Sequence, residues 1–166
     1  LAEAAHGRGS VVCVTGEPGD GKTAVVEQFL SDLPSGGVAV GRCSERLAGT
    51  EAYLPVLDAL DFLVRGDGGP AFAEVLRRAA PSWRARLGGS PDAGGGQERL
   101  KREFAAFLEE ATWNRPLVLF LDDVHWADPS STDLLAYLGG RLGGLRVLVV
   151  VTYRPSDLAL SRHPFG

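Results

Sequence analysis

One octapeptide, Gly16–Thr23, limits what this chain of 166 residues can fold into more than any other segment. It has glycine at its first and sixth positions, followed by lysine and threonine, which is the spacing G-x-x-x-x-G-K-[ST]. Before it, Ser10–Thr15 is β-branched and apolar, as in a buried strand of a parallel sheet. After it, Ala24–Leu33 carries apolar residues at helical spacing. Strand, glycine-rich loop and helix thus follow the order that a phosphate-binding loop requires.

The residue types in this loop explain how it would hold phosphate. Gly16, Gly19 and Gly21 allow backbone conformations closed to residues with a Cβ, so successive N–H groups can turn inward around an anion. A helix beginning near Gly21 adds unpaired N–H groups and the positive end of its dipole. Lys22 supplies a full charge for the β- and γ-phosphates, and the Thr23 hydroxyl is expected to ligate Mg²⁺. With ATP and Mg²⁺ as the predicted cofactors, the predicted nucleotide-binding residues are Gly16, Glu17, Pro18, Gly19, Asp20, Gly21, Lys22, Thr23 and Ala24.

A second polar site follows another apolar segment. Leu117–Leu121 reads as a strand buried on both faces, and it runs directly into Asp122 and Asp123. Ligands of open parallel sheets gather at the carboxyl ends of the strands. We therefore expect Asp122 to hold Mg²⁺ through water, and Asp123 to orient or polarise the attacking water. The predicted metal ligands are thus Thr23 and Asp122.

A strand expected over Leu145–Thr152 places one more charged residue near the same edge. Arg154 follows this strand, and a planar cation is well suited to phosphate oxygens, although a solvated arginine at a strand end is the alternative. A lone histidine is more often structural, so a structural role for His125 is favoured over a chemical one. Asp128 precedes Pro129 and is expected to cap a helix. The predicted catalytic residues are Lys22, Asp123 and Arg154.

The remaining segments predict a single α/β domain over residues 1–166, a P-loop NTPase with a parallel β-sheet flanked by helices. Val38–Arg42 is expected to be a strand that completes a β-α-β unit with Ser10–Thr15. Further helices are expected over Tyr53–Val64, from Pro70 to a stop at Pro81, and over Gln97–Thr112, the last packed on the sheet. Gly88–Gly96 is expected to be a mobile surface loop rather than a domain boundary.

Composition indicates which partners and which cellular location to expect for this domain. A net charge of −4 argues against direct nucleic-acid binding by this domain, because duplex DNA requires many lysines and arginines. No apolar run is long enough to cross a membrane and no signal-peptide pattern begins the chain, so we expect no membrane partner and a cytoplasmic location. Cys13 and Cys43 form no disulfide framework, and both are expected to be buried. The chain lacks methionine even at position 1, which indicates a piece of a longer protein.

Three segments together resemble a known family. GEPGDGKT (residues 16–23), LFLDDVHWAD (residues 119–128) and VVTYRP (residues 150–155) are similar to the origin-recognition-type AAA ATPase domain of STAND signalling NTPases. Such domains occur in bacterial LuxR-type transcriptional regulators, in multidomain cyclases and in related sensor kinases. The resemblance implies a strand order in which the Thr152 strand lies between the first strand and the Asp122 strand. It assigns Lys22 and Thr23 to the Walker A phosphate loop, Asp122 and Asp123 to the Walker B acidic pair, and Arg154 to the sensor position.

The chain departs from that family in three respects. Asp20 stands where the family more often has an apolar or small residue, so a carboxylate could face the phosphates or turn to solvent. The usual Gly-Arg-x-x-Glu segment before the first strand is absent, with His6–Gly9 as the nearest fragment, so adenine contacts are unassigned. The family's fifth strand and helical lid would follow Gly166, so we expect an AAA+ core without its lid and with the first strand at an open edge.

The sequence leaves three functions open. The leading hypothesis is an ATP-binding, slowly hydrolysing switch module of a signalling or transcription-regulatory protein, which self-associates or contacts neighbouring domains of the full-length protein. The second is a P-loop phosphotransferase, although a kinase should show an acceptor site and lid arginines instead of His-Trp-Ala-Asp at residues 125–128. The third is a nucleotide binder without turnover, which is an alternative because the Asp20 carboxylate could face the phosphates.

Overall fold

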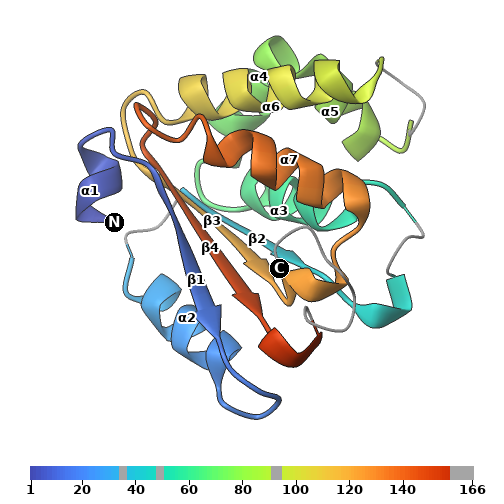
Figure 1. Cartoon of the computed structure of the whole chain (residues 1–166). Helices are drawn as coiled ribbons and strands as arrows, with labels where there is room; N and C mark the ends of the chain where they lie inside the picture. The colour runs from blue at the N-terminus through green and yellow to red at the C-terminus, as the bar shows by residue number, and fades with distance from the viewer. Residues whose placement is uncertain (34–36, 48–50, 91–94, 158–166) are drawn as a thin grey trace.

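Four parallel strands form one sheet in the computed structural model, which describes residues 1–33, 37–47, 51–90 and 95–157 (Figure 1). In chain order the strands are β1 (Ser10–Thr15), β2 (Val38–Arg42), β3 (Leu117–Asp122) and β4 (Val147–Tyr153). Their order across the sheet is β1-β4-β3-β2. The α/β fold class is therefore confirmed, and so is the position of the Thr152 strand between the first strand and the Asp122 strand.

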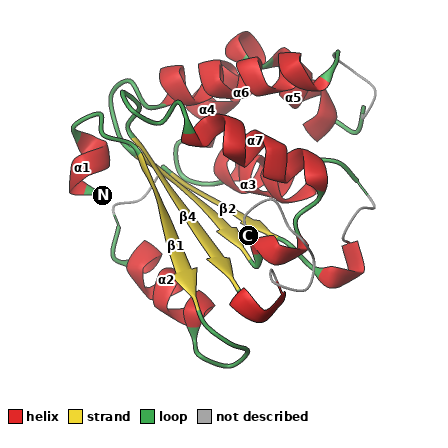
Figure 2. Ribbon diagram, viewed as in Figure 1, coloured by secondary structure: helices red, strands yellow, loops and turns green. Residues whose placement is uncertain are grey.

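Helices cover the sheet unequally, as Figures 1 and 2 show: α2 lies on one side, whereas α3 and α7 lie on the other beneath a further layer of α4, α5 and α6. The α-helices are α1 (Ala2–Ala5), α2 (Lys22–Ser31), α3 (Leu54–Arg65), α4 (Gly69–Ala79), α5 (Pro81–Leu87), α6 (Gln97–Ala111) and α7 (Pro129–Gly139). Two 3₁₀ turns, η1 (Glu45–Leu47) and η2 (Val124–Trp126), complete the described elements. None of the helices in these described ranges is long and apolar enough to cross a membrane.

The alternation of side chains along β3 and β4 divides the core in two. Odd-numbered residues such as Leu119 and Val149 belong to the large cluster beneath α3 to α7, and even-numbered residues such as Phe120 and Val150 pack with Val26 of α2. Because both faces of these strands are covered, every position of β3 is apolar until the terminal aspartate. The central strands are therefore a rigid base for the residues at their carboxyl ends.

The first strand differs from the expected buried strand. Val11 and Val12 are 46% and 44% exposed, because within the described residues β1 pairs only with β4 and forms one edge of the sheet. The edge position implied by the family resemblance is thus confirmed, whereas the burial expected from β-branched composition is wrong. Cys13 is exposed for the same reason, while Cys43 is buried as predicted. Burial raises the pKa of the Cys43 thiol to about 12, so that thiol stays protonated.

Strands β1 and β2 are joined through α2 and are parallel in one sheet, as in the expected β-α-β unit, with β4 and β3 between them. Two further expectations need correction. Pro81 begins the unpredicted helix α5, since a proline in the first helical turn lacks only an N–H group that would be unpaired anyway. Helix α6 packs mainly against α4, α5 and α7, and its layer lies over α3 and α7 rather than directly on the sheet (Figure 1). The predicted loop over Gly88–Gly96 includes residues 91–94, which lie outside the described residues, so its mobility stays a prediction.

Candidate nucleotide site

The phosphate loop connects β1 to α2 at the carboxyl edge of the sheet. Gly19 and Gly21 have φ values of 91° and 79°, in the left-handed region that favours glycine, and nothing lies within 4 Å of where a Cβ would stand at either. Gly21 is the N-cap of α2, and no side chain caps this helix. Its first-turn N–H groups and the positive end of its dipole are therefore open to an anion, as the sequence predicted.

Lys22 and Asp20 both turn back onto this loop. Lys22 is 8% exposed, and its ammonium donates to the Glu17 carbonyl at 2.9 Å. Asp20 Oδ2 accepts a hydrogen bond from the Glu17 N–H at 2.7 Å, and a Cβ at Gly16 would lie 2.9 Å from the same oxygen. Of the two orientations open to Asp20, the structure thus has the carboxylate on the loop backbone. The loop thus holds a lysine and an aspartate that both contact the backbone of Glu17.

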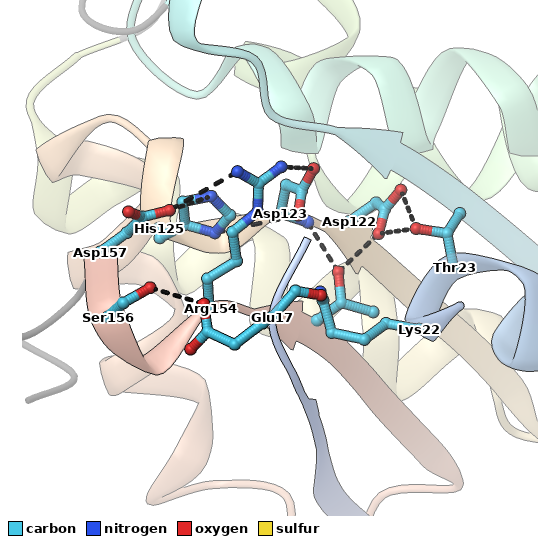
Figure 3. Close-up of polar contacts among 10 residues, drawn as sticks. Glu17, Lys22, Thr23, Asp122, Asp123, His125, Arg154, Ser156 and Asp157 are labelled. Carbon is cyan, nitrogen blue, oxygen red and sulfur yellow. Dashed lines mark hydrogen bonds and ion pairs between the residues drawn. The ribbon is translucent and has the colours of Figure 1, made fainter. Parts of the chain in front are cut away.

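Thr23 and Asp122 meet across the site, although they are 99 residues apart in sequence. The Thr23 hydroxyl lies 3.0 Å from Asp122 Oδ1 and 3.1 Å from Oδ2 (Figure 3). The Thr152 hydroxyl is 2.5 Å from Asp122 Oδ1. Sequence reasoning did not single out Thr152, although its place at the end of the strand beside Asp122 was a usable signal. Two hydroxyls therefore converge on one buried carboxylate.

Asp123 belongs to a second group of charges beside the first. Its backbone is left-handed, with φ 55° and ψ 47°, and its carboxylate lies 4.0 Å from the Arg154 guanidinium (Figure 3). Arg154 also lies 3.7 Å from Asp157, which in turn lies 3.4 Å from His125 Nε2. The structure thus brings the predicted Asp123 and Arg154 together. Nothing in the sequence reasoning pointed to Asp157.

His125 is enclosed between these carboxylates. Its side chain is buried, and neither ring nitrogen has a hydrogen-bond partner among the described residues. Burial lowers the pKa of His125, and this outweighs the opposing effects of Asp123 and Asp157. The neutral ring therefore serves as packing beside the acidic pair, in keeping with the structural reading of a lone histidine.

The segment after β4 also contacts the phosphate loop. The Ser156 hydroxyl donates to the Glu17 carboxylate at 3.0 Å (Figure 3). Together with the approach of Arg154 to Asp123 and of Asp157 to His125, this contact connects the chain that leaves β4 both to the phosphate loop and to the segment after β3. Asp128, by contrast, accepts from the Ser131 N–H at the start of α7 and is a helix cap, as expected.

The polar groups that converge here fit magnesium brought by a nucleotide. Within the described ranges, no group of three or more histidine, cysteine, aspartate or glutamate side chains could hold a metal ion. Mg²⁺ seldom uses such a cage, and is usually held by one or two carboxylates, by waters and by the phosphates of its substrate. Asp122 and Thr23 at the mouth of the phosphate loop supply this kind of partial site.

Comparison with known proteins agrees with this geometry. The family model of the AAA ATPase domain matches residues 1–151, which includes the phosphate loop and the acidic pair. The chain belongs to the AAA ATPase domain family. It is also 28% identical over 171 residues to a protein of Rhizobium meliloti (strain 1021) that is named only as uncharacterized. That alignment covers 90% of this chain and 17% of the relative, so the chain spans less than a fifth of the relative's length.

Membership of the AAA ATPase family accounts for the main features of the site. The family indicates nucleotide binding and hydrolysis, generally with ATP and Mg²⁺. The loop, the α2 N-terminus and the Thr23–Asp122 contact lie inside the matched residues, whereas Arg154 and Asp157 lie beyond them. The roles of individual side chains stay predictions.

Proposed function

We propose that this AAA ATPase domain is an ATP-binding, slowly hydrolysing switch module of a larger signalling or transcription-regulatory protein in the cytoplasm. The observation that carries the proposal is the convergence of Thr23 and Asp122 beside the buried Lys22, at the open N-terminus of α2. Its partners would be neighbouring domains of the full-length protein or another copy of the chain. The small share of the Rhizobium relative that the chain covers supports a place within a longer protein.

Nucleotide binding would use groups that now contact one another. The phosphates would lie against the loop and first-turn N–H groups from Gly16 to Ala24, and Lys22 would exchange the Glu17 carbonyl for phosphate oxygens. Thr23 and Asp122 are the residues that would hold Mg²⁺. When bound, this ion neutralises charge on the β- and γ-phosphate oxygens.

Hydrolysis would depend on Asp123 and Arg154. The Asp123 carboxylate is partly exposed and can accept a proton from a water molecule, while Arg154 can stabilise charge that develops on the phosphoryl oxygens. In the present arrangement Arg154 lies between the carboxylates of Asp123 and Asp157. These two carboxylates compete with a phosphate for the same guanidinium, which favours slow turnover.

Through Ser156 and Asp157, a change at the nucleotide site would alter the contacts of the chain after β4. A nucleotide that displaces Lys22 changes a contact of Glu17, to which Ser156 is hydrogen-bonded, and one that draws Arg154 moves a residue of the chain after β4 itself. Such a change in a few contacts is what a two-state switch requires, provided the nucleotide favours one arrangement over the other.

Nucleotide binding without turnover is the second candidate, because the Asp20 carboxylate already accepts the Glu17 N–H within the phosphate loop. Single-turnover hydrolysis with the full-length protein separates the candidates. The switch proposal predicts slow phosphate release without any added acceptor, and a loss of about a hundredfold in Asp123→Asn with ATP binding retained. ATP binding with no turnover above buffer supports the second candidate. Formation of ADP only when an acceptor is added supports a phosphotransferase.

A further inference from the structure

We propose that Thr152 is a positioning residue that orients both members of the acidic pair. This inference rests on the proposed nucleotide-binding function of the site. Thr152 is the sixth residue of β4 and has no exposed surface. The register pairs Leu121 with Val151, so Thr152 lies beside Asp122 at the carboxyl edge of the sheet. It belongs to neither the phosphate loop nor the acidic pair.

The hydrogen bonds of Thr152 have a fixed direction. The Asp123 N–H lies 2.8 Å from Thr152 Oγ1, and because a backbone N–H can only donate, Oγ1 accepts this bond. The hydroxyl proton is then available to Asp122 Oδ1 at 2.5 Å, and an ionised carboxylate can only accept. The bonds therefore run from the Asp123 backbone through Thr152 to the Asp122 carboxylate. One hydroxyl connects the two acidic residues.

This connection bears on both predicted roles. Asp123 has a left-handed backbone that few residues other than glycine, asparagine and aspartate adopt, and its N–H bond to Thr152 stabilises that turn out of β3. The turn directs the Asp123 carboxylate toward Arg154. For Asp122, the second hydroxyl comes from Thr23 on α2, next to the phosphate loop, whereas Thr152 belongs to the buried sheet. A ligand held by a rigid neighbour keeps its orientation when the loop moves.

Thr152→Val and Thr152→Ser separate the hydroxyl from the size of the side chain. Valine keeps the volume and removes the hydroxyl, while serine keeps the hydroxyl and loses the methyl group. Thr112→Val is a matched control, because Thr112 is also buried and its hydroxyl donates to the Leu108 carbonyl in α6, outside the candidate site. Two properties are measured in the full-length protein: hydrogen exchange of the peptide containing Asp123 without nucleotide, and ATP affinity with and without Mg²⁺ by calorimetry.

In Thr152→Val, exchange at Asp123 is expected to rise about tenfold or more, because its amide loses a buried acceptor. The gain in ATP affinity that Mg²⁺ provides is expected to fall roughly ten- to a hundredfold, the usual effect of removing a group that orients a metal ligand. ATP affinity without Mg²⁺ should not change. Thr152→Ser should restore both properties, and Thr112→Val should match the wild type.

Wild-type exchange and Mg²⁺ dependence in Thr152→Val would overturn the proposal. An equal loss of ATP affinity with and without Mg²⁺ would also overturn it, since this indicates a general structural defect. If Thr152→Val does not fold, Thr152→Cys takes its place, because the thiol is a weaker donor and acceptor of similar size. Wild-type exchange and Mg²⁺ dependence in Thr152→Cys would then overturn the proposal. If the wild type binds no ATP, the proposed function fails, whereas exchange at Asp123 still decides whether Thr152 holds the Asp123 turn.

Discussion

Asp20 is the residue of the phosphate loop whose charge opposes the proposed ligand. Its carboxylate accepts the Glu17 N–H at 2.7 Å and lies over Gly16, on the loop that would surround the phosphates. Asp20→Asn keeps an oxygen that can accept this bond and removes the charge alone. Asp20→Ala removes both the charge and the acceptor. We expect both variants to bind ATP more tightly than the wild type.

The magnitude follows from the exposure of Asp20. Two unit charges about 6 Å apart interact by about 0.7 kcal/mol in water, and by ~3 kcal/mol at an effective dielectric constant of about 20. Asp20 is exposed, so the lower figure is the better guide. Removal of the charge should therefore stabilise bound ATP by about 1 kcal/mol, or roughly fivefold in affinity. Asp20→Ala also frees the Glu17 N–H for phosphate, which adds a gain of up to ~1 kcal/mol.

Calorimetric titration with Mg-ATP at low and high salt tests this reasoning. Salt screens exposed charges, so the advantage of Asp20→Asn over the wild type should shrink as ionic strength rises. Asp67→Asn removes the same charge from the exposed connection between α3 and α4 and should leave ATP affinity unchanged. Affinity in Asp20→Asn equal to or below that of the wild type at low salt would refute the idea that this carboxylate repels the phosphates.

Three other predictions concern the metal, the core and acid stability. Asp122→Ala should weaken the Mg²⁺-dependent part of ATP binding and leave binding without Mg²⁺ intact, as measured by the same titration; an equal loss in both would contradict its role as a metal ligand. Phe104→Ala should lower the free energy of unfolding by about 3–5 kcal/mol in urea titration, because Phe104 is buried against Trp83, whereas Phe62→Ala, which is half exposed, should cost far less. His125→Phe should make the protein less sensitive to acid. Because burial lowers the pKa of His125 below 6.5, the unfolded chain binds the proton first, so stability present above pH 6.5 is lost as the pH falls below it. Equal losses in wild type and variant between pH 7.5 and 5.5 would contradict this effect.

The parts of the site that are local in sequence could be predicted from it. The phosphate loop needs only glycines at fixed spacing and the helix that follows, and α2 begins at Lys22 as this pattern requires. The acidic pair follows a run of apolar residues that identifies a strand buried on both faces, and all six residues of β3 are buried. In both cases the residues of one short segment are enough to predict its structure.

Features that depend on the neighbours of a segment could not be predicted in this way. The residues of β1 are as β-branched as those of β4, and the pairing that leaves β1 at an edge and exposes Cys13 is not written in its own sequence. Thr152 resembles any other strand residue until the register places it beside Asp122. The contacts of Asp157 with Arg154 and His125 depend on how the chain folds after β4, which its local sequence does not indicate.

The most direct test of this account is calorimetric binding of Mg-ATP to the full-length protein and to Lys22→Ala. Lys22 is the one residue of the phosphate loop with a full positive charge, and its ammonium is held at the loop by the Glu17 carbonyl. Arg84→Ala removes one positive charge from the exposed surface of α5 and serves as the control. We predict a loss of about a hundredfold or more in Lys22→Ala, that is ~2.7 kcal/mol, and wild-type affinity in the control. Unchanged Mg-ATP affinity in a folded Lys22→Ala variant would contradict it.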